Sequence, residues 1–384
     1  MKRTAEPSAP RHRVIFLAAL LSVAAGGGRG AGNDDAKAPG DIDANAAWRK
    51  TIPIIDVHGH ISAASIEKTL EAMDSNFISR MVNLTPGRNA VELAAAQKAF
   101  AEKGKGRFVL YVNDVYQNFP IEDPEFGKKT ADVIEECVRL GARGLKISKG
   151  LGLYWKDRSG KIVPIDDPRL DPMWEACGRL DIPVSIHSGD PRAFWLPVDE
   201  KNERYDELRD HPGWAFGGGA FPPREEVLAQ LERVVAKHAK VTFVGVHFGN
   251  DPEDVDHVAA MFRRLPNYNA DIAARIPEIG RQKPEKLRKL FIEFQDRILF
   301  GTDFMVSPSG YILGAGPRIE DRAEVKKFFD AHWRFLETEA RGMTHPTPIQ
   351  GRWTIDAIHL PREVLEKIYF RNAERIILKK GKVE

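Results

Sequence analysis

The chain has 384 residues, of which 42% are hydrophobic and 29% charged, and its formal net charge is +2. This composition is typical of a globular protein with a large apolar core, and α/β barrels of 250 residues or more often form a single domain. A net charge so close to zero gives no reason to expect nucleic acid or an anionic membrane surface as a partner.

The N-terminal segment has the composition of a secretory signal peptide. Basic residues precede a short apolar run, residues 14–25, and small residues follow it. The apolar run is too short to cross a bilayer as a helix. We therefore expect an exported protein, periplasmic or extracellular, with no stable membrane insertion after signal removal. The expected organisation is a signal peptide (1–32), a linker (33–50) and one domain (51–384).

Short apolar runs alternate with helical patterns from residue 52 onward. The expected strands are 52–57, 78–84, 108–113, 144–148, 182–187, 241–247, 268–272 and 297–303. The expected helices between them are 66–73, 90–103, 128–140, 172–180, 225–238, 253–265 and 285–295. Runs that are apolar almost throughout indicate parallel strands buried on both faces. The alternation predicts a closed (β/α)8 barrel of the TIM type, with a C-terminal helical extension over 320–340 and 361–378.

The two cysteines of the chain, Cys137 and Cys177, both lie inside helical patterns. Export would permit a disulfide, but we expect two buried free thiols. Their wide separation in the sequence also argues against a metal site built on the pair.

Three of the expected loops that follow strands are unusually long: 149–167, 188–223 and 304–318. In a barrel, such loops gather at the C-terminal ends of the strands, where they form lids and binding surfaces. The second loop combines Trp195, Arg204 and Trp214 with a glycine run. These side chains would suit a carboxylated or aromatic substrate, and a packed surface lid without substrate contact is an equal alternative.

Two histidines, His58 and His60, follow the first expected strand with Gly59 between them. Residues at positions i and i+2 of an extended chain point to the same side. Imidazoles are the commonest protein ligands for zinc, manganese and iron, so the pair could form half of a metal site. For this motif alone, a solvated or hydrogen-bonded pair is the alternative.

Other expected strands also end in residues that bind metals or transfer protons. The fifth ends in His187, the sixth in His247 and the eighth in Asp303. Together with the histidine pair, these side chains would meet at one end of the barrel. Such a set predicts a metal centre there.

These motifs resemble those of the amidohydrolase superfamily, in particular the amidohydrolase-related branch that includes aminocarboxymuconate-semialdehyde decarboxylase. The matching segments are Asp56-Val-His-Gly-His60, Gly144-Leu-Lys146, Pro183-Val-Ser-Ile-His187, Gly245-Val-His247, Asn269-Ala-Asp271, Leu299-Phe-Gly-Thr-Asp303 and the terminal Lys367-Ile-Tyr-Phe-Arg-Asn-Ala373. The resemblance spans residues 52–378. It is specific for the superfamily and not for one reaction.

The resemblance implies a role for each of the matched residues. The residues that it assigns as metal ligands are His58, His60, His187 and Asp303. It also places His247 beside the nucleophile as a catalytic residue. Lys146 stands where members with two metals carry a carboxylated lysine; the alternative, which we favour, is a free amine hydrogen-bonded in the barrel or contacting substrate.

The residue types also carry a mechanism of their own. Three imidazole nitrogens and one carboxylate suit one Zn²⁺, with Mn²⁺ or Fe²⁺ as alternatives, and leave a position for water. Coordination would lower the pKa of that water to about 7. Asp303 could then take its proton, and His247 could orient the water or stabilise oxyanion charge.

We therefore expect a metal-dependent hydrolase that cleaves a C–N or C–O bond of a small-molecule substrate. A metal-dependent nonoxidative decarboxylase of a small aromatic or unsaturated carboxylic acid is the first alternative, because the same branch contains such enzymes. A non-catalytic metal- or ligand-binding barrel is the second. A homodimer is left open.

Overall fold

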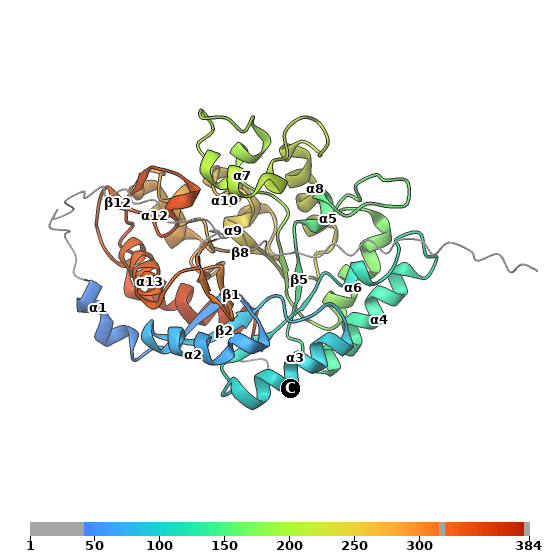
Figure 1. The fold of residues 1–384 in the computed structure, drawn as a ribbon, viewed down its shortest axis with the longest axis horizontal. Coiled ribbons are helices and arrows are strands. Elements are labelled where there is room, and N and C mark those ends of the chain that lie inside the picture. Colours follow the sequence, from blue (N-terminus) through green and yellow to red (C-terminus); the bar gives the residue numbers. More distant parts are fainter. Residues whose placement is uncertain (1–41, 315–318, 380–384) are drawn as a thin grey trace, which may run out of the picture. The chain divides into compact units, whose positions relative to one another are not determined.

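Strands and helices alternate along the chain, as expected (Figure 1). The computed structural model describes residues 42–314 and 319–379. The expected signal peptide, 1–32, and residues 33–41 of the expected linker lie outside this part. The strands are β1 (Ile54–Ile61), β2 (Ile78–Asn83), β3 (Phe108–Leu110), β4 (Val112–Asn113), β5 (Leu145–Ile147), β6 (Val184–Ile186), β7 (Phe243–Gly245), β8 (Tyr268–Asp271), β9 (Ile298–Leu299), β10 (Phe304–Ser307), β11 (Gly310–Ile312), β12 (Met343–Thr344) and β13 (Thr354–Ile355).

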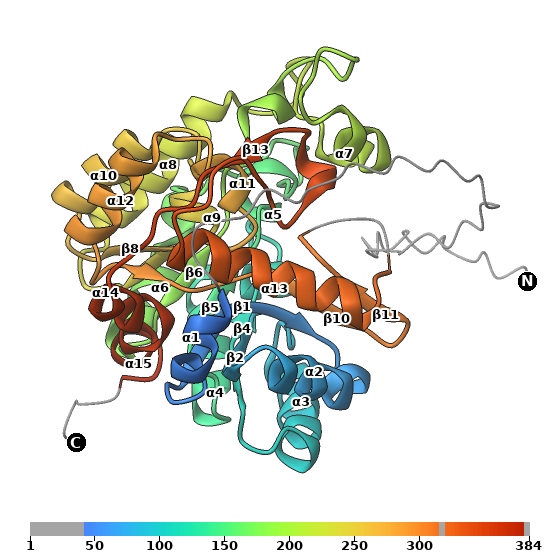
Figure 2. The same ribbon diagram turned by 90° about the vertical axis from the view of Figure 1, so that its left-hand side faces the viewer.

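Helices connect successive strands and lie around them in both views (Figures 1 and 2). The helices are α1 (Ile42–Arg49), α2 (Ile66–Ser75), α3 (Ala90–Lys103), α4 (Phe126–Arg139), α6 (Asp171–Arg179), α7 (Tyr205–Asp210), α8 (Arg224–Lys237), α10 (Val255–Arg264), α11 (Ile276–Ile279), α12 (Pro284–Glu293), α13 (Arg322–Glu337), α14 (Arg362–Glu366) and α15 (Asn372–Ile376), with short turns α5 (Gly150–Leu153) and α9 (Val246–Gly249). Among the described residues, no helix has both the length and the apolar character that crossing a membrane requires.

Two runs of hydrogen-bonded strands make up the barrel. Their orders are β11-β10-β1-β2-β3 and β4-β5-β6-β7-β8-β9, and the pairs from β1 to β9 are parallel. β3 and β4 are one extended segment interrupted at Tyr111, which joins the two runs. At the other seam, the backbone N–H of Val57 donates to Phe300 O over 3.0 Å, and β10 pairs in parallel with β1. The strands therefore close into a barrel, which confirms the predicted (β/α)8 fold.

Burial of the strands and of one face of each outer helix explains why apolar runs alternate with amphipathic helical patterns in the sequence. Ile54, Val82 and Val184 in the strands are at most 1% exposed. Helix α4 buries Ile134 and Cys137 on its inner face. The two residues are three positions apart, the spacing that places them on the same side of an amphipathic helix. Both cysteines of the chain are free and buried, as expected.

The C-terminal extension predicted from helical patterns is also present. Helix α13 and the segment from α14 through the π-helical turn η7 (Lys367–Arg371) to α15 follow the last barrel strand. The N–H of Phe300 donates to Ile368 O over 2.9 Å, which fastens η7 to the barrel. Helix α1 occupies residues that were expected to be linker. Arg49, at its C-terminal end, is 2% exposed and forms a buried ion pair with Glu337, which joins α1 to α13.

Several strand ends differ from the expected ones. Strand β1 continues to Ile61, so His58 and His60 lie inside it and not after it. Strand β7 ends at Gly245, and His247 follows in a left-handed conformation with φ of 57°. Asp303 also has a positive φ, 63°, between β9 and β10. An apolar run in the sequence gives no sign of such a turn in a residue other than glycine.

Candidate metal centre

The two histidines of β1 point to the same acidic side chain. His60 Nε2 lies 3.1 Å and His58 Nε2 3.3 Å from the same oxygen, Oδ1 of Asp303. Both rings therefore lie on the same side of β1, as predicted. A Cβ at the intervening Gly59 would lie 2.7 Å from the sulfur of Met81 on β2, so a larger residue there would have to displace that buried side chain.

Asp303 reaches the histidines from the neighbouring seam of the barrel. Its backbone N–H donates to His58 O over 3.0 Å, which holds the left-handed residue beside β1. Burial alone would raise the pKa of Asp303, but the charge of His58 and the hydrogen bond with His60 hold that pKa well below its usual range. Asp303 is therefore an ionised carboxylate at neutral pH.

The tautomer of His58 is set by Asp271 at the end of β8. Oδ2 of Asp271 lies 2.9 Å from His58 Nδ1 and accepts its proton, so the lone pair of the neutral ring is on Nε2. Oδ1 of Asp271 accepts from the backbone N–H groups of His247 (2.8 Å) and Ala273 (3.1 Å). Asp271 ends one of the matching segments in the sequence, but neither a ligand nor a catalytic role was predicted for it.

His247 is fixed in the same way. Its Nδ1 lies 2.8 Å from the carbonyl oxygen of Ala273, which can only accept, so Nε2 carries the lone pair. Burial, with the charges of His187 and Arg275, lowers the pKa of His247 well below its usual value and keeps the ring neutral.

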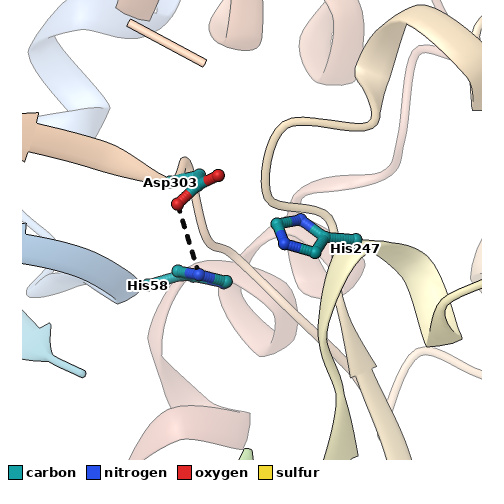
Figure 3. Close-up of side chains that lie close together, drawn as sticks. All are labelled: His58, His247 and Asp303. Carbon is teal, nitrogen blue, oxygen red and sulfur yellow. Dashed lines mark ion pairs between the residues drawn. The ribbon is translucent and has the colours of Figure 1, made fainter. Parts of the chain in front are cut away.

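In these tautomers, His58 and His247 each leave Nε2 as the ring nitrogen that can bind a metal, beside the carboxylate of Asp303. One ligand atom from each residue lies within 4.8 Å of the other two (Figure 3). A divalent cation held by two imidazole lone pairs and the carboxylate would replace the proton that otherwise pairs His58 with Asp303. The set fits a divalent metal.

His187, predicted to be a ligand, lies beside His247 with 4.3 Å between the ring centres. Its Nε2 contacts Oδ1 of Asp190 at 3.1 Å, which leaves Nδ1 as the nitrogen with the lone pair. Burial lowers the pKa of His187 to about 4. Asp190 was not singled out in the sequence, because one carboxylate in a long loop has no pattern that identifies it.

His60 completes the group on its more open side. Thr85 Oγ1 lies 3.0 Å from Nδ1 of His60 and can accept its proton, which would leave Nε2 for a metal. The side chains of His60, His187 and Asp303 keep 20%, 14% and 12% of their surface exposed, whereas His58 keeps 1%. The side chains of these three residues are therefore partly open to solvent, whereas His58 is enclosed.

Lys146 on β5 lies near the carboxylates of the site. It is 3% exposed, and its Nζ has no hydrogen-bond partner within residues 42–314 and 319–379. Burial lowers the pKa of Lys146 to about 8, against the opposing effect of Asp271, Asp303 and Asp114. A measurable fraction of this amine is therefore neutral near pH 7.

The long loop 188–223 packs on itself and on the barrel. Arg204, considered above as a substrate contact, is fully buried and pairs with Glu207 and Glu278. The aromatic residues of the loop 188–223 instead surround Lys149, which belongs to the loop 149–167. Nζ of Lys149 lies 4.4 Å from the centre of a ring of Trp214. The cation that these aromatic residues hold near the site is therefore Lys149 and not Arg204.

Comparisons with known proteins agree with this fold. A family model described as amidohydrolase matches residues 55–377. An uncharacterised TIM-barrel protein from Bordetella bronchiseptica has a similar structure, with a TM-score of 0.53, 17% identity, and coverage of 86% of this chain and 100% of that one. A 2,6-dihydroxybenzoate decarboxylase bound to 2,6-dihydroxybenzoate gives a TM-score of 0.50 and 16% identity, with the same coverage. At these identities the likeness shows the fold alone. No curated protein matches the chain.

Proposed function

The chain belongs to the amidohydrolase family, as its motifs predicted, and we propose that it is a metal-dependent hydrolase acting at a C–N or C–O bond of a small molecule. Members of the family are enzymes, and the convergence of possible metal-ligand atoms described above supports a metal-dependent reaction. That convergence is the observation that carries the proposal.

We assign the metal ligands as predicted from the sequence: His58, His60, His187 and Asp303. One Zn²⁺ is the first choice for this nitrogen-rich set, with Mn²⁺ or Fe²⁺ as alternatives. When bound, such an ion would acidify a water molecule and polarise a carbonyl oxygen. The exposed edges of His60, His187 and Asp303 supply the approach for both.

We assign the proton transfer to Asp303 and the orientation of the water to His247. Asp303, held ionised by its histidine neighbours, accepts a proton from the attacking water and returns it to the leaving group. His247 accepts a hydrogen bond through Nε2, because Nδ1 is committed to Ala273 O. Of the two roles expected for His247, this tautomer supports orienting the water and does not support donation to an oxyanion.

Nonoxidative decarboxylation is the second candidate, supported by its occurrence in the branch that the motifs resemble. It would use the same ligands but would need a proton donor to carbon, and the acceptor character of His247 and Asp303 favours hydrolysis over it. A panel of esters, amides and aromatic acids, 2,6-dihydroxybenzoate included, separates the two. Release of CO₂ without turnover of any ester or amide would overturn hydrolysis.

The assignment of ligand and catalyst is tested by metal content measured beside kcat. His187→Ala should lower both, because the ion loses a ligand. Asp303→Asn should keep much of the metal and lose about 10²-fold or more in kcat, because an amide cannot take a proton. His247→Asn should keep the metal and lose rate.

Two outcomes would contradict the assignment. If His247→Asn loses metal as readily as His187→Ala, then His247 is a ligand, as its place in the group of three would also allow. If Asp303→Asn keeps full activity, the hydrolytic mechanism is wrong. His238→Asn is the control: His238 follows the outer helix α8 and contacts Asp171, the first residue of α6, at 3.0 Å, so its loss should change neither quantity. A metal-loaded protein with no turnover on any probe would instead support the non-catalytic metal- or ligand-binding barrel.

A further inference from the structure

The carboxylate of Asp190 joins three loops at the C-terminal end of the barrel. Oδ1 lies 3.1 Å from His187 Nε2 after β6, and 3.4 Å from an Nη of Arg275 after β8. Oδ2 lies 2.6 Å from Nζ of Lys149 after β5. Asp190 is 2% exposed, and its backbone oxygen also accepts from Arg224 Nε over 2.9 Å.

The turn that carries Asp190 is held in place by a buried amide. Oδ1 of Asn250 accepts from the backbone N–H groups of Ser188 (2.8 Å) and Gly189 (3.3 Å), and Asn250 is fully buried. A Cβ at Gly189 would lie 2.9 Å from Asn250 O, so the turn packs closely against it. The direction of the Asp190 side chain is therefore set by packing.

Lys149 connects this carboxylate to the long loop 188–223. Its Nζ lies 4.4 Å from a ring of Trp214 and 5.6 Å from the rings of Phe194 and Phe216. The lysine side chain is 16% exposed. Cation–π contacts of a partly desolvated ammonium add to the ion pair with Asp190, so the loop and the carboxylate are held to each other.

We propose that Asp190 is the positioning residue of His187 and that Lys149 transmits the state of the aromatic loop to it. The carboxylate accepts the Nε2–H of His187, which selects one tautomer and leaves the Nδ1 lone pair for the metal. Lys149, by occupying the second oxygen, keeps the carboxylate from rotating away. This inference rests on the proposed metal-binding role of His187.

Asparagine at position 190 is a sharp test, because it offers one oxygen where the carboxylate offers two. His187 Nε2, Lys149 and Arg275 all donate to this group, so an amide must turn its NH₂ toward at least one donor. Asp190→Asn should weaken Zn²⁺ binding by about 10- to 100-fold, the usual effect of losing such a partner. The affinity is measured by chelator competition.

Imidazole ¹⁵N and ¹H NMR of the zinc-loaded protein gives the direct readout. In the wild type, His187 should be protonated on Nε2 with Nδ1 bound. Lys149→Met should weaken Zn²⁺ binding less than Asp190→Asn does but should broaden or shift the His187 Nε2–H signal. Lys149→Arg, which keeps a cation at this position, should give the same His187 signal as the wild type. Asp171→Asn is the matched control, since Asp171 is likewise shared by a histidine and a lysine, His238 and Lys237, but on the outer helices.

The outcomes separate this inference from the proposed function. A wild-type His187 protonated on Nδ1 overturns it, and that measurement needs no variant to fold. Equal loss of zinc affinity in Asp190→Asn and Asp171→Asn also overturns it, because the effect would then be one of general stability. An unchanged His187 signal in Lys149→Met removes the coupling to the loop. If the tautomer and affinities are as expected but no probe is turned over, the proposed function fails and Asp190 keeps its role.

Discussion

Asp271→Asn tests the hydrogen-bond arrangement on which the proposed metal centre depends. In the wild type, Oδ2 accepts the Nδ1 proton of His58 while Oδ1 accepts two backbone N–H groups, those of His247 and Ala273. An asparagine can keep the two backbone bonds through its single oxygen. Its NH₂ then faces His58 Nδ1, which must become an acceptor, and the proton of the neutral ring moves to Nε2.

The expected loss can be worked out from these bonds. A ligand whose lone pair is replaced by a proton no longer binds, and loss of an orienting carboxylate alone costs about 10- to 100-fold in metal affinity. We therefore expect at least a 100-fold weaker Zn²⁺ affinity for Asp271→Asn, equivalent to about 2.7 kcal/mol or more. The fold should lose less, about 1 kcal/mol, because the two backbone bonds remain.

Asp56→Asn provides the matched control. Asp56 is fully buried on the same strand as His58 and accepts from the backbone N–H groups of His58 (3.0 Å) and Thr302 (3.1 Å) and from the Thr302 hydroxyl (2.5 Å). Its burial raises its pKa to about 7, so the neutral amide resembles a form that the wild type already samples. The hydroxyl can rotate to accept from the new NH₂.

The assay is chelator competition for Zn²⁺ on the two variants and the wild type, with urea unfolding to measure stability. We expect Asp56→Asn to bind Zn²⁺ within a few-fold of the wild type and Asp271→Asn to bind far more weakly. Wild-type affinity in a folded Asp271→Asn would refute the tautomer argument. Similar losses in both variants would show that any change at this end of the barrel disturbs the ion.

Three further predictions concern other parts of the chain. The protein should bind close to one ion per chain whatever the bicarbonate supply during expression; two ions, with one lost in Lys146→Ala, would show a carboxylated lysine bridging a second metal. Burial lowers the pKa of His332 to about 4. The unfolded chain, with a pKa near 6.5, then binds more protons as the pH falls from about 6.5 to 4, so the free energy of unfolding should fall by about 2 kcal/mol from this residue between about pH 7 and pH 5. Urea unfolding of His332→Gln, measured at several pH values, should show a free energy of unfolding that falls less between pH 7 and pH 5 than in the wild type. An unchanged pH dependence would contradict this assignment. N-terminal sequencing of protein from its host should find a mature start between Ala25 and Asp35; an intact Met1 on cytoplasmic protein would remove the export proposal.

The barrel could be predicted because its determinants are local and repeated. Each strand is a short apolar run and each outer helix has a buried stripe, so one pattern identifies every unit. The ends of the strands could not be placed as well. His247 and Asp303 leave their strands through left-handed backbone, which costs energy for any residue other than glycine and leaves no mark in composition.

The histidines and Asp303 of the candidate site could be singled out from the sequence because they stand next to recognisable strands. Their carboxylate partners could not. The chain contains 55 aspartates and glutamates, and nothing in the local sequence separates Asp190 from those that form surface ion pairs. Asp271 ends a matching segment, but that segment does not show which side chain its carboxylate orients. Their roles depend on which loop lies opposite, and that is decided by the closure of the barrel.

Left-handed backbone follows several of the strands that end at the candidate site. His247, Phe248, Asn250, Ala274 and Asp303 have φ between 54° and 64°, and they follow β7, β8 and β9. Such conformations cost about 1 kcal/mol or more each, so they persist only where surrounding bonds hold them. At His247 the holding bond comes from Oδ1 of Asp271, whose other oxygen orients His58. One carboxylate therefore both stabilises the turn that brings His247 into the site and fixes the tautomer of His58, a proposed ligand, so at this position the energy of folding and the geometry of the proposed metal centre depend on the same group.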